Sequence, residues 1–332
     1  MLTFFRKRNH YLPFFVLAIG APLSTYSFAL SPSLGLSFSI VTVYGFYMEL
    51  MTQWSFRAPT RRKPSIDDAS WTPVDFNLGE HTVKLYHKVT SPGGPTALLI
   101  HGWTSGSIRM IQRAQPFLDR GWNVVLVDLP SHGGSSRLAK WSAEQSCTLL
   151  LGALNALDEQ QQNLFSGPVV AYGHSMGCFI GLRISKRRSE LTFGDQLKGW
   201  VFESPMTGYT EIFDETCSLL RVPRVLRGAL LRNTIRHFNA INQSTTMLTS
   251  LHEADMPLWG TPSEPLLLVQ ATPDERLGEH HHRRLTSVME QHGLLDLLTT
   301  HHLSSLRHSG SHEHKERENV VGAWLDTHSS SF

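Results

Sequence analysis

The chain has few cysteines and almost no net charge. Its 332 residues include only Cys147, Cys178 and Cys217, with no Cys-x-x-Cys pair. An odd, sparse set of this kind excludes a disulfide framework and a zinc ribbon, and it favours buried thiols in a reducing compartment. The formal net charge of +2 produces no strong global field. Nucleic acid is therefore not expected as a partner.

Internal repeats are also missing. The hydrophobic fraction of 41% is ordinary for a protein with a buried core. The length fits one large domain with additions, or two small domains.

The first 57 residues differ in composition from the rest. Apolar stretches cover residues 11–30 and 34–51, and each is near the length that crosses a bilayer. Basic residues flank the pair on both sides: Arg6, Lys7, Arg8, Arg57, Arg61, Arg62 and Lys63. Because basic flanks stay in the cytoplasm, the pattern favours a membrane hairpin with the following domain on the cytoplasmic face.

Two other interpretations of this segment stay open. A signal peptide cleaved near the Ser27-Phe28-Ala29 sequence would leave the second apolar stretch as an anchor. A buried helical extension of a soluble domain would need no membrane. Residues 58–73, which are rich in proline, serine and charge, are expected to form a linker.

From residue 74 to 328, short β-rich runs alternate with helical ones. Strands are expected at residues 83–89, 96–100, 124–127, 169–172, 199–202, 266–270 and 295–298. Helices are expected at residues 108–120, 144–162, 176–188, 280–292 and 313–327. This alternation predicts an α/β fold with a mostly parallel, doubly wound sheet. Its ligand site would lie beyond the carboxyl ends of the strands.

Residues 205–262 interrupt the alternation and are expected to form a helical cap inserted into this domain. The insertion contains five arginines and no acidic residue between positions 218 and 240, namely Arg221, Arg224, Arg227, Arg232 and Arg236. They fit either a solvated helix face or a basic lid that contacts anionic lipid headgroups.

A Gly-His-Ser-Met-Gly motif follows the expected strand at 169–172 and opens an expected helix. Such a strand must reverse into a helix within a few residues, which strains the backbone at Ser175 and presents its hydroxyl above the sheet. Gly173 and Gly177 remove the Cβ atoms that would otherwise clash. The motif predicts Ser175 as a nucleophile.

An attack by a hydroxyl on a carbonyl leaves negative charge on oxygen, which backbone amides must stabilise. The amide of Met176, directly after the serine, is one expected donor. The other is the amide of Trp103, because His101-Gly102-Trp103 follows the expected strand at 96–100. His101 itself is expected to be structural.

His101-Gly102, the turn at 128–135 and the serine motif occur in this order at strand ends. Together they resemble the α/β-hydrolase family, in particular its lysophospholipase, monoglyceride lipase and serine aminopeptidase branch. The resemblance covers about residues 74–327 and implies the α/β-hydrolase fold. The sequence departs from the family pattern at Cys178 and Ala271, where the family favours glycine.

The family order implies an acid and then a histidine after the serine. Asp274 follows the expected strand at 266–270 and is the first candidate for the acid. Glu203, at the end of the preceding strand, is the second, and Glu275 is a weak third. The acid would orient the histidine and stabilise its cation.

The histidine is expected just before the last helix. His312-Glu313, followed by Glu318 and Trp324, resembles the family's terminal motif, so His312 is the first candidate for the base and His308 the second. Other histidines nearby have no metal-ligand spacing: His280, His281, His282, His301, His302 and His314. Neither a metal nor another cofactor is expected.

These residues predict a serine hydrolase that cleaves a carboxylic ester through an acyl-enzyme, with a small-molecule or lipid ester as substrate. A thioesterase or peptidase on the same triad is one alternative. A binding protein that keeps the fold without turnover is another.

Overall fold

The computed structural model describes residues 11–328, so the basic cluster Arg6, Lys7 and Arg8 lies outside the described residues. The chain forms two compact units. The smaller unit comprises residues up to Ala58, together with 139–142 and 212–251. The larger unit comprises residues 59–138, 143–211 and those from His252 onward.

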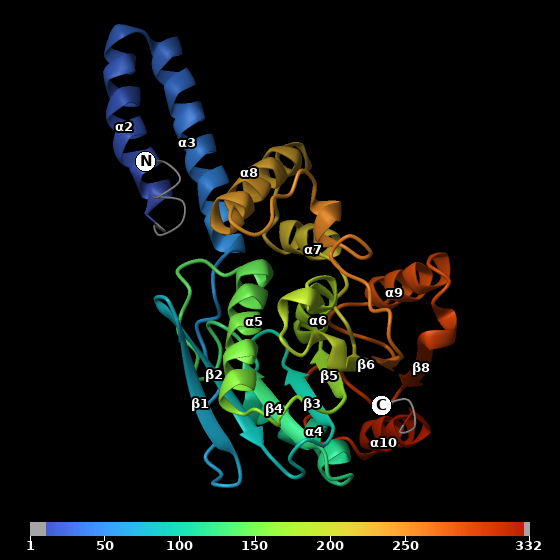
Figure 1. Cartoon of the computed structure of the whole chain (residues 1–332). Helices are drawn as coiled ribbons and strands as arrows, with labels where there is room; N and C mark the ends of the chain where they lie inside the picture. Colours follow the sequence, from blue (N-terminus) through green and yellow to red (C-terminus); the bar gives the residue numbers. More distant parts are fainter. Residues whose placement is uncertain (1–10, 329–332) are drawn as a thin grey trace. The chain divides into compact units, whose positions relative to one another are not determined.

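The larger unit is built on a sheet that, within the described residues, has 8 strands in the order β1-β2-β4-β3-β5-β6-β7-β8 (Figure 1). The strands β1 and β2 join the sheet antiparallel, and the other neighbours are parallel. The bounds are β1 Thr72–Leu78, β2 His81–Lys88, β3 Thr96–Ile100, β4 Asn123–Asp128, β5 Val169–His174, β6 Leu197–Glu203, β7 Leu266–Ala271 and β8 Leu298–Leu303.

The central strands are apolar without alternation because helices cover both faces of the sheet. Every residue of β3 and β4 is buried. Ala97 and Leu99 share one apolar cluster with Phe117 and Trp324 from two helices. Successive side chains of a strand point to opposite faces, so Leu98 faces the other helix layer.

Helices α4 (Ile111–Leu118) and α10 (Lys315–His328) pack together on one face of the sheet, and α5 (Ala143–Gln160) packs with α6 (Met176–Lys186) on the other. Helix α9 (His280–Gln291) joins β7 to β8. Short 3-10 turns complete the described part of this unit: η1 Ser107–Arg109, η2 Arg188–Glu190, η3 Gly194–Gln196, η4 Leu251–Ala254 and η5 Leu295–Leu297.

The predicted α/β class and the mostly parallel sheet are confirmed. The strand expected at residues 295–298 is wrong, because residues 295–297 form η5 and β8 runs from Leu298 to Leu303. As an edge strand, β8 exposes Thr300, His301 and His302, so no apolar run marks it. Strand β1 was not expected and begins inside the expected linker.

The smaller unit contains a hairpin of two long apolar helices. Helix α2 (Leu12–Leu30) and helix α3 (Pro32–Ser55) run side by side along their lengths (Figure 1). The chain reverses at Ser31, whose backbone is extended, and Pro32 then starts α3. Proline is favoured there because the first helical position needs no amide donor.

The expected cap insertion is helical in the described chain. It holds α7 (Thr210–Leu219), α8 (Arg224–Asn242) and η4. Helix α3 packs on α8 through a small core that its last turns share with the insertion, formed by Met48, Met51, Cys217, Val222 and Leu230. Residues 212–251 of the insertion and the N-terminal helices therefore belong to one compact unit.

A buried carboxylate links the two helices on one face of the larger sheet. Glu144 on α5 is fully buried and accepts hydrogen bonds from Arg183 Nε at 2.6 Å and Arg187 Nη1 at 2.9 Å. Arg187 also pairs with Glu190 at 2.8 Å, but that carboxylate is about half exposed.

We expect Glu144→Gln to lower the free energy of unfolding by about 3 kcal/mol, because it removes the buried negative charge that Arg183 and Arg187 share and leaves Arg187 only the half-exposed Glu190. Glu190→Gln is the matched control and should cost less than about 1 kcal/mol. Urea unfolding of the full chain, followed by tryptophan fluorescence, measures both. Equal losses would contradict this account of the α5–α6 contact.

Candidate active site

Ser175 lies at the sharp turn between β5 and α6. Its φ of 54° and ψ of −116° fall in a region that residues with a side chain rarely adopt. Three backbone hydrogen bonds hold this conformation. The Ser175 amide donates to the Glu203 carbonyl at 3.0 Å, and the Ser175 carbonyl accepts from the amides of Cys178 and Met206 at 3.0 and 3.2 Å.

The flanking glycines permit this turn because neighbouring backbone approaches them closely. A Cβ on Gly177 would come within 2.1 Å of the Ile100 carbonyl oxygen, and one on Gly173 would lie 2.6 Å from the Cys178 amide. Neither position has room for a side chain. The two glycines therefore fix α6 against the end of β3 and present Ser175 at the end of the sheet.

A continuous hydrogen-bonded chain begins at the Ser175 hydroxyl. Ser175 Oγ lies 2.9 Å from His308 Nε2, and His308 Nδ1 lies 2.9 Å from Asp274 Oδ2. His308 and Asp274 are buried, and Ser175 is 9% exposed. The three side chains come from the loops after β5, β7 and β8, where strands of a parallel sheet end.

Asp274 has the environment of an ionised carboxylate. Burial alone would raise its pKa, but the hydrogen bond from His308 and those from the amides of Leu277 and Arg276 outweigh burial and lower the pKa. Both amides donate to Oδ1 at 2.9 Å, whereas Oδ2 accepts from His308 Nδ1 at 2.9 Å and from Gln270 Nε2 at 3.3 Å. The carboxylate can therefore hold His308 Nδ1–H and stabilise a charged imidazole.

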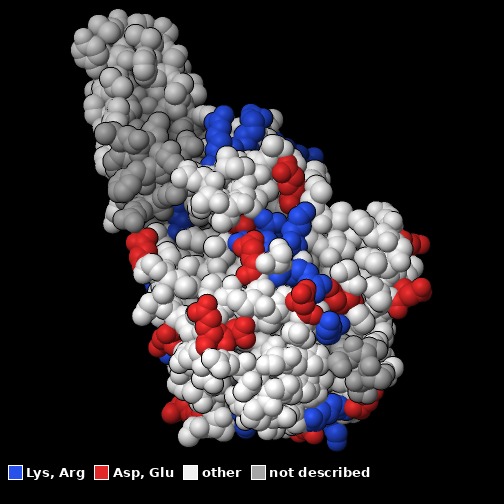
Figure 2. Space-filling model, viewed as in Figure 1, with Lys and Arg blue, Asp and Glu red and all other residues white. Residues whose placement is uncertain are grey.

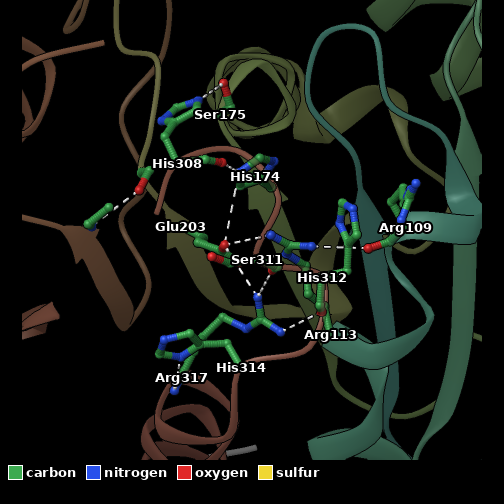
Figure 3. A network of polar contacts seen from close by, with 12 residues as sticks. Arg109, Arg113, His174, Ser175, Glu203, His308, Ser311, His312, His314 and Arg317 are labelled. Carbon is green, nitrogen blue, oxygen red and sulfur yellow. Dashed lines mark hydrogen bonds and ion pairs between the residues drawn. The ribbon is translucent and has the colours of Figure 1, made fainter. Parts of the chain in front are cut away.

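The expectation that His312 is hydrogen-bonded to Ser175 is wrong, because His308 makes that contact. The ring of His312 lies beside Arg109 and Arg113, away from Ser175 (Figure 3). Burial lowers the pKa of His312, and the positive charges of Arg109 and Arg113 lower it further. A histidine among these cations is a poor proton acceptor.

The error arose from the placement of the last strand and helix. Strand β8 ends at Leu303 and α10 begins at Lys315, so the intervening loop begins later and is shorter than expected. His308 lies near the middle of this loop. A turn through Gly310, with a φ of 91°, then carries the chain away toward α10.

Two side chains that the sequence analysis did not single out, the largely buried His174 and the buried Arg317, fix this loop. His174 Nε2 donates to the His308 carbonyl at 3.1 Å. Arg317, which is 1% exposed, donates to the carbonyls of Ser311 and His312 at 2.8 and 2.9 Å. Burial lowers the pKa of His174 to about 3, so its ring stays neutral.

Glu203, the second candidate for the acid, lies at the end of β6 and does not contact His308 in the described structure. Its carboxylate binds Arg113 through two hydrogen bonds, at 2.7 and 2.6 Å, and lies 3.5 Å from Arg317 (Figure 3). The Tyr172 hydroxyl donates to it as well. Burial would raise its pKa, but the charges of Arg113 and Arg317 hold the pKa well below the usual range. Glu275, the third candidate, is exposed.

The loop after β3 lies next to the serine. A Cβ on Gly102 would be 3.1 Å from the Ser175 Cβ and 3.0 Å from His174 Nδ1. His101 is fully buried and bridges two loops, because its Nδ1 bonds the Gly102 carbonyl at 2.7 Å and its Nε2 accepts the Leu129 amide at 3.1 Å. This arrangement is structural, as expected for His101.

The turn at 128–135 is held by hydrogen bonds from backbone amides to the Asp128 carboxylate. Asp128 Oδ1 accepts the Ser107 amide at 2.8 Å, and its Oδ2 accepts the Gly134 amide at 2.8 Å. His281, on α9, is buried and accepts a hydrogen bond from the amide of Thr207. Over residues 11–328 there is no cluster of three His, Cys, Asp or Glu side chains that could hold a metal ion.

The sequence profile of the alpha/beta hydrolase family matches residues 97–312 of the chain. No curated protein sequence matches it significantly. Similar solved structures include an esterase from Pyrococcus furiosus, with 15% identity, a TM-score of 0.56, and coverage of 82% of this chain and 97% of the esterase.

Two more similar structures are alpha/beta hydrolases by description. Mouse alpha/beta hydrolase domain-containing protein 10 has 14% identity and a TM-score of 0.53, covering 78% of this chain and 99% of its own. An alpha-beta hydrolase from Vibrio vulnificus has 17% identity and a TM-score of 0.52, covering 80% and 82%. At such low identity the likeness concerns the fold.

Three buried or largely buried histidines of the larger unit make its stability depend on pH. Burial lowers the pKa of His132 and His174 to about 3 and that of His281 to about 4. A histidine in the unfolded chain titrates near 6.5. Below that pH the unfolded state therefore binds protons that the folded state does not.

We expect the free energy of unfolding to be highest above pH 6.5 and to fall steadily as the pH drops from 6.5 toward 3 to 4. Urea unfolding of the full chain at a series of pH values measures this slope. His174→Gln removes one of the three groups and should make the slope shallower. A slope unchanged by the substitution would show that His174 does not stay neutral in the folded state.

Proposed function

The chain belongs to the alpha/beta hydrolase family, and from that premise we propose that it is a serine hydrolase that cleaves carboxylic esters. The observation that carries this proposal is the hydrogen-bonded chain from Ser175 through His308 to Asp274, which starts at a strained turn. Nucleophilic catalysis by serine requires a hydroxyl in contact with a histidine that can accept its proton, and Ser175 and His308 have this arrangement.

In the first half of the reaction, Ser175 Oγ attacks the ester carbonyl carbon while His308 Nε2 accepts the hydroxyl proton. The resulting tetrahedral intermediate collapses, the bond to the alkoxy oxygen breaks, and His308 gives its proton to the departing alcohol. In the second half, His308 takes a proton from water, and the water oxygen attacks the acyl-enzyme. The bond from the acyl carbon to Ser175 Oγ then breaks, His308 returns the proton to Ser175 Oγ, and the acid leaves.

Asp274 keeps His308 in the correct tautomer and stabilises its cation. The hydrogen bond from Nδ1–H to Asp274 leaves Nε2 free of a proton and directed at Ser175. Because hydrogen bonds lower the pKa of Asp274, its carboxylate is charged at neutral pH and favours the imidazolium that forms during attack.

The backbone amides of Met176 and Trp103 are the proposed donors to the oxyanion. Met176 is the first residue of α6, so its amide lies at the positive end of the helix dipole. Trp103 follows Gly102, whose backbone comes close to Ser175. Donors from these two positions would stabilise charge as it develops on the carbonyl oxygen.

We further propose that the α2–α3 hairpin anchors the enzyme in a membrane and that its substrate is an acyl lipid. Both helices are apolar enough to cross a bilayer, with mean hydropathies of 1.5 and 1.4. Only 17% and 28% of their windows are buried in the protein. Large apolar side chains such as Leu36, Ile40 and Val43 are about 60% exposed, which is costly in water.

The antiparallel hairpin returns both of its ends to the same side of the membrane. The three cysteines are free and buried, which suits a catalytic unit on the cytoplasmic face. An anchored hydrolase would meet esters that are themselves dissolved in the bilayer.

The kinetic test separates the two candidate histidines. With a short-chain aryl ester as substrate, His308→Ala should lower kcat/KM by about 10⁴-fold or more, because Ser175 loses its proton acceptor. His312→Ala, the matched control in the same loop, should stay within about tenfold of the wild type. A large loss for His312→Ala with little change for His308→Ala would overturn the assignment.

A further inference from the structure

The two compact units differ sharply in charge. The smaller unit has ten Lys and Arg residues against three Asp and Glu, a net charge of +7. The larger unit has twenty against twenty-five, a net charge of −5. The chain total of +2 therefore conceals a strongly basic unit, and this unit is the one that holds the apolar hairpin. A basic surface of this kind attracts anionic partners.

The exposed face of α8 carries much of this charge. Arg224, Arg232 and Arg236 recur at intervals of four or eight residues, so they lie along one face, and all three are exposed. Figure 2 shows basic side chains gathered over α8. No acidic residue occurs in the sequence from Thr216 to His252.

These arginines form no ion pair with other described residues. Within residues 11–328, no hydrogen bond or ion pair involves the side chains of Arg221, Arg224, Arg232 or Arg236. Arg227 differs, because it bonds the Val222 carbonyl and the Ser218 hydroxyl at 3.3 Å. Four guanidinium groups are therefore available to an external anion.

Exposed aliphatic side chains lie among the arginines. Leu219, at the end of α7, is 78% exposed, and Val225, in the first turn of α8, is 88% exposed. Arg221 and Arg224 lie between them along the chain and are also exposed. This mixture of arginine with protruding aliphatic residues suits the boundary between lipid headgroups and acyl chains.

A buried polar cluster ties the base of α3 to α8. His237 Nε2 lies 2.8 Å from Glu49 Oε1, to which Gln53 Nε2 also donates at 2.7 Å. Asn233 on α8 donates to Thr52 Oγ1 at 2.9 Å. The exposed arginine face is therefore held at a fixed place relative to the base of the hairpin.

Glu49 also limits how far the hairpin enters a bilayer. A carboxylate, even one paired with histidine and amide groups, is costly to place in hydrocarbon. The inserted part of α3 therefore ends before Glu49, and residues 32–47 span about 24 Å. The last two turns of α3, from Glu49 onward, then lie at the level of the lipid headgroups, and so does α8, which packs on them.

We propose that the α7–α8 turn and the exposed face of α8 form a binding surface for anionic phospholipid headgroups at the base of the hairpin. Leu219 and Val225 insert at the interface, and Arg221, Arg224, Arg232 and Arg236 contact the phosphates. This inference rests on the proposed membrane anchor. The attached apolar hairpin and the aliphatic tip favour a lipid surface over a soluble polyanion.

The test compares two vesicle populations that compete for the full chain as detergent is removed. One population is pure phosphatidylcholine. The other is phosphatidylcholine with 30% phosphatidylglycerol (roughly one anionic lipid in three), and its denser lumen lets the two populations be separated by centrifugation. Each basic residue near such a surface adds on the order of 1 kcal/mol, which is about fivefold per residue at most. We expect wild type to favour the anionic vesicles by at least about tenfold in low salt, and less in high salt.

The variant carries Gln at Arg221, Arg224, Arg232 and Arg236, and should lose most of this preference. The matched control has the same loss of charge on the larger unit, at exposed positions: Lys186→Gln, Lys198→Gln, Arg283→Gln and Lys315→Gln. It should keep the preference. Unchanged unfolding midpoints and ester turnover would show that both variants are folded.

The outcomes separate the two proposals. Equal capture of wild type by both vesicle populations, resistant to carbonate washing, would overturn the arginine surface and leave the anchor standing. Recovery of wild type in the soluble fraction without capture would overturn the anchor and the inference together. An equal loss of preference in both variants would overturn the assignment to α8. If the four substitutions weakened binding to a soluble RNA but left the preference for anionic vesicles unchanged, the assignment of lipid headgroups as the partner would be overturned.

Discussion

The carboxylate of Glu203 lies at the centre of the contacts that shape the site. It is 1% exposed and is held by Arg113 through two hydrogen bonds, with Arg317 at 3.5 Å. The carbonyl of the same residue accepts the Ser175 amide. One residue at the end of β6 therefore contacts both the strained serine and the arginine that fixes the histidine loop.

A buried carboxylate can occupy this position only because its partners are in place. An unpaired charge in the protein interior would be strongly destabilising. Arg317 also donates to the carbonyls of Ser311 and His312, and thereby defines the end of a loop that has no regular structure. His174 holds the His308 carbonyl from the other side. The Ser175–His308 distance therefore depends on residues that do not touch Ser175 Oγ.

The sequence allowed part of this site to be predicted. Ser175 follows from a motif of five neighbouring residues whose backbone physics is local, and Asp274 follows from the buried strand before it. His308 could not be chosen with the same certainty, because β8 is an edge strand with exposed histidines and no apolar run. The resemblance of the chain around His312 to a family motif then favoured the wrong residue of one loop.

The supporting network had no local signal at all. Arg113, Glu203 and Arg317 are separated by about a hundred residues each and meet only because α4 and α10 cover one face of the sheet. Likewise, the apolar pattern of residues 34–51 predicted a helix, but it gave no reason for an acidic residue, Glu49, within that helix. Its partner His237 lies on α8, in a different part of the sequence. Ion pairs of this kind depend on tertiary packing, which a single sequence does not display.

The central claim is that Ser175 is the nucleophile activated by His308. The most direct measurement is peptide mass spectrometry of the full chain after reaction with a fluorophosphonate, which phosphonylates an activated serine and releases fluoride. The account predicts one adduct on the peptide that contains Ser175, and no adduct in Ser175→Ala or, within the same reaction time, in His308→Ala. Labelling of another serine at the wild-type rate, with Ser175 unmodified, would contradict it.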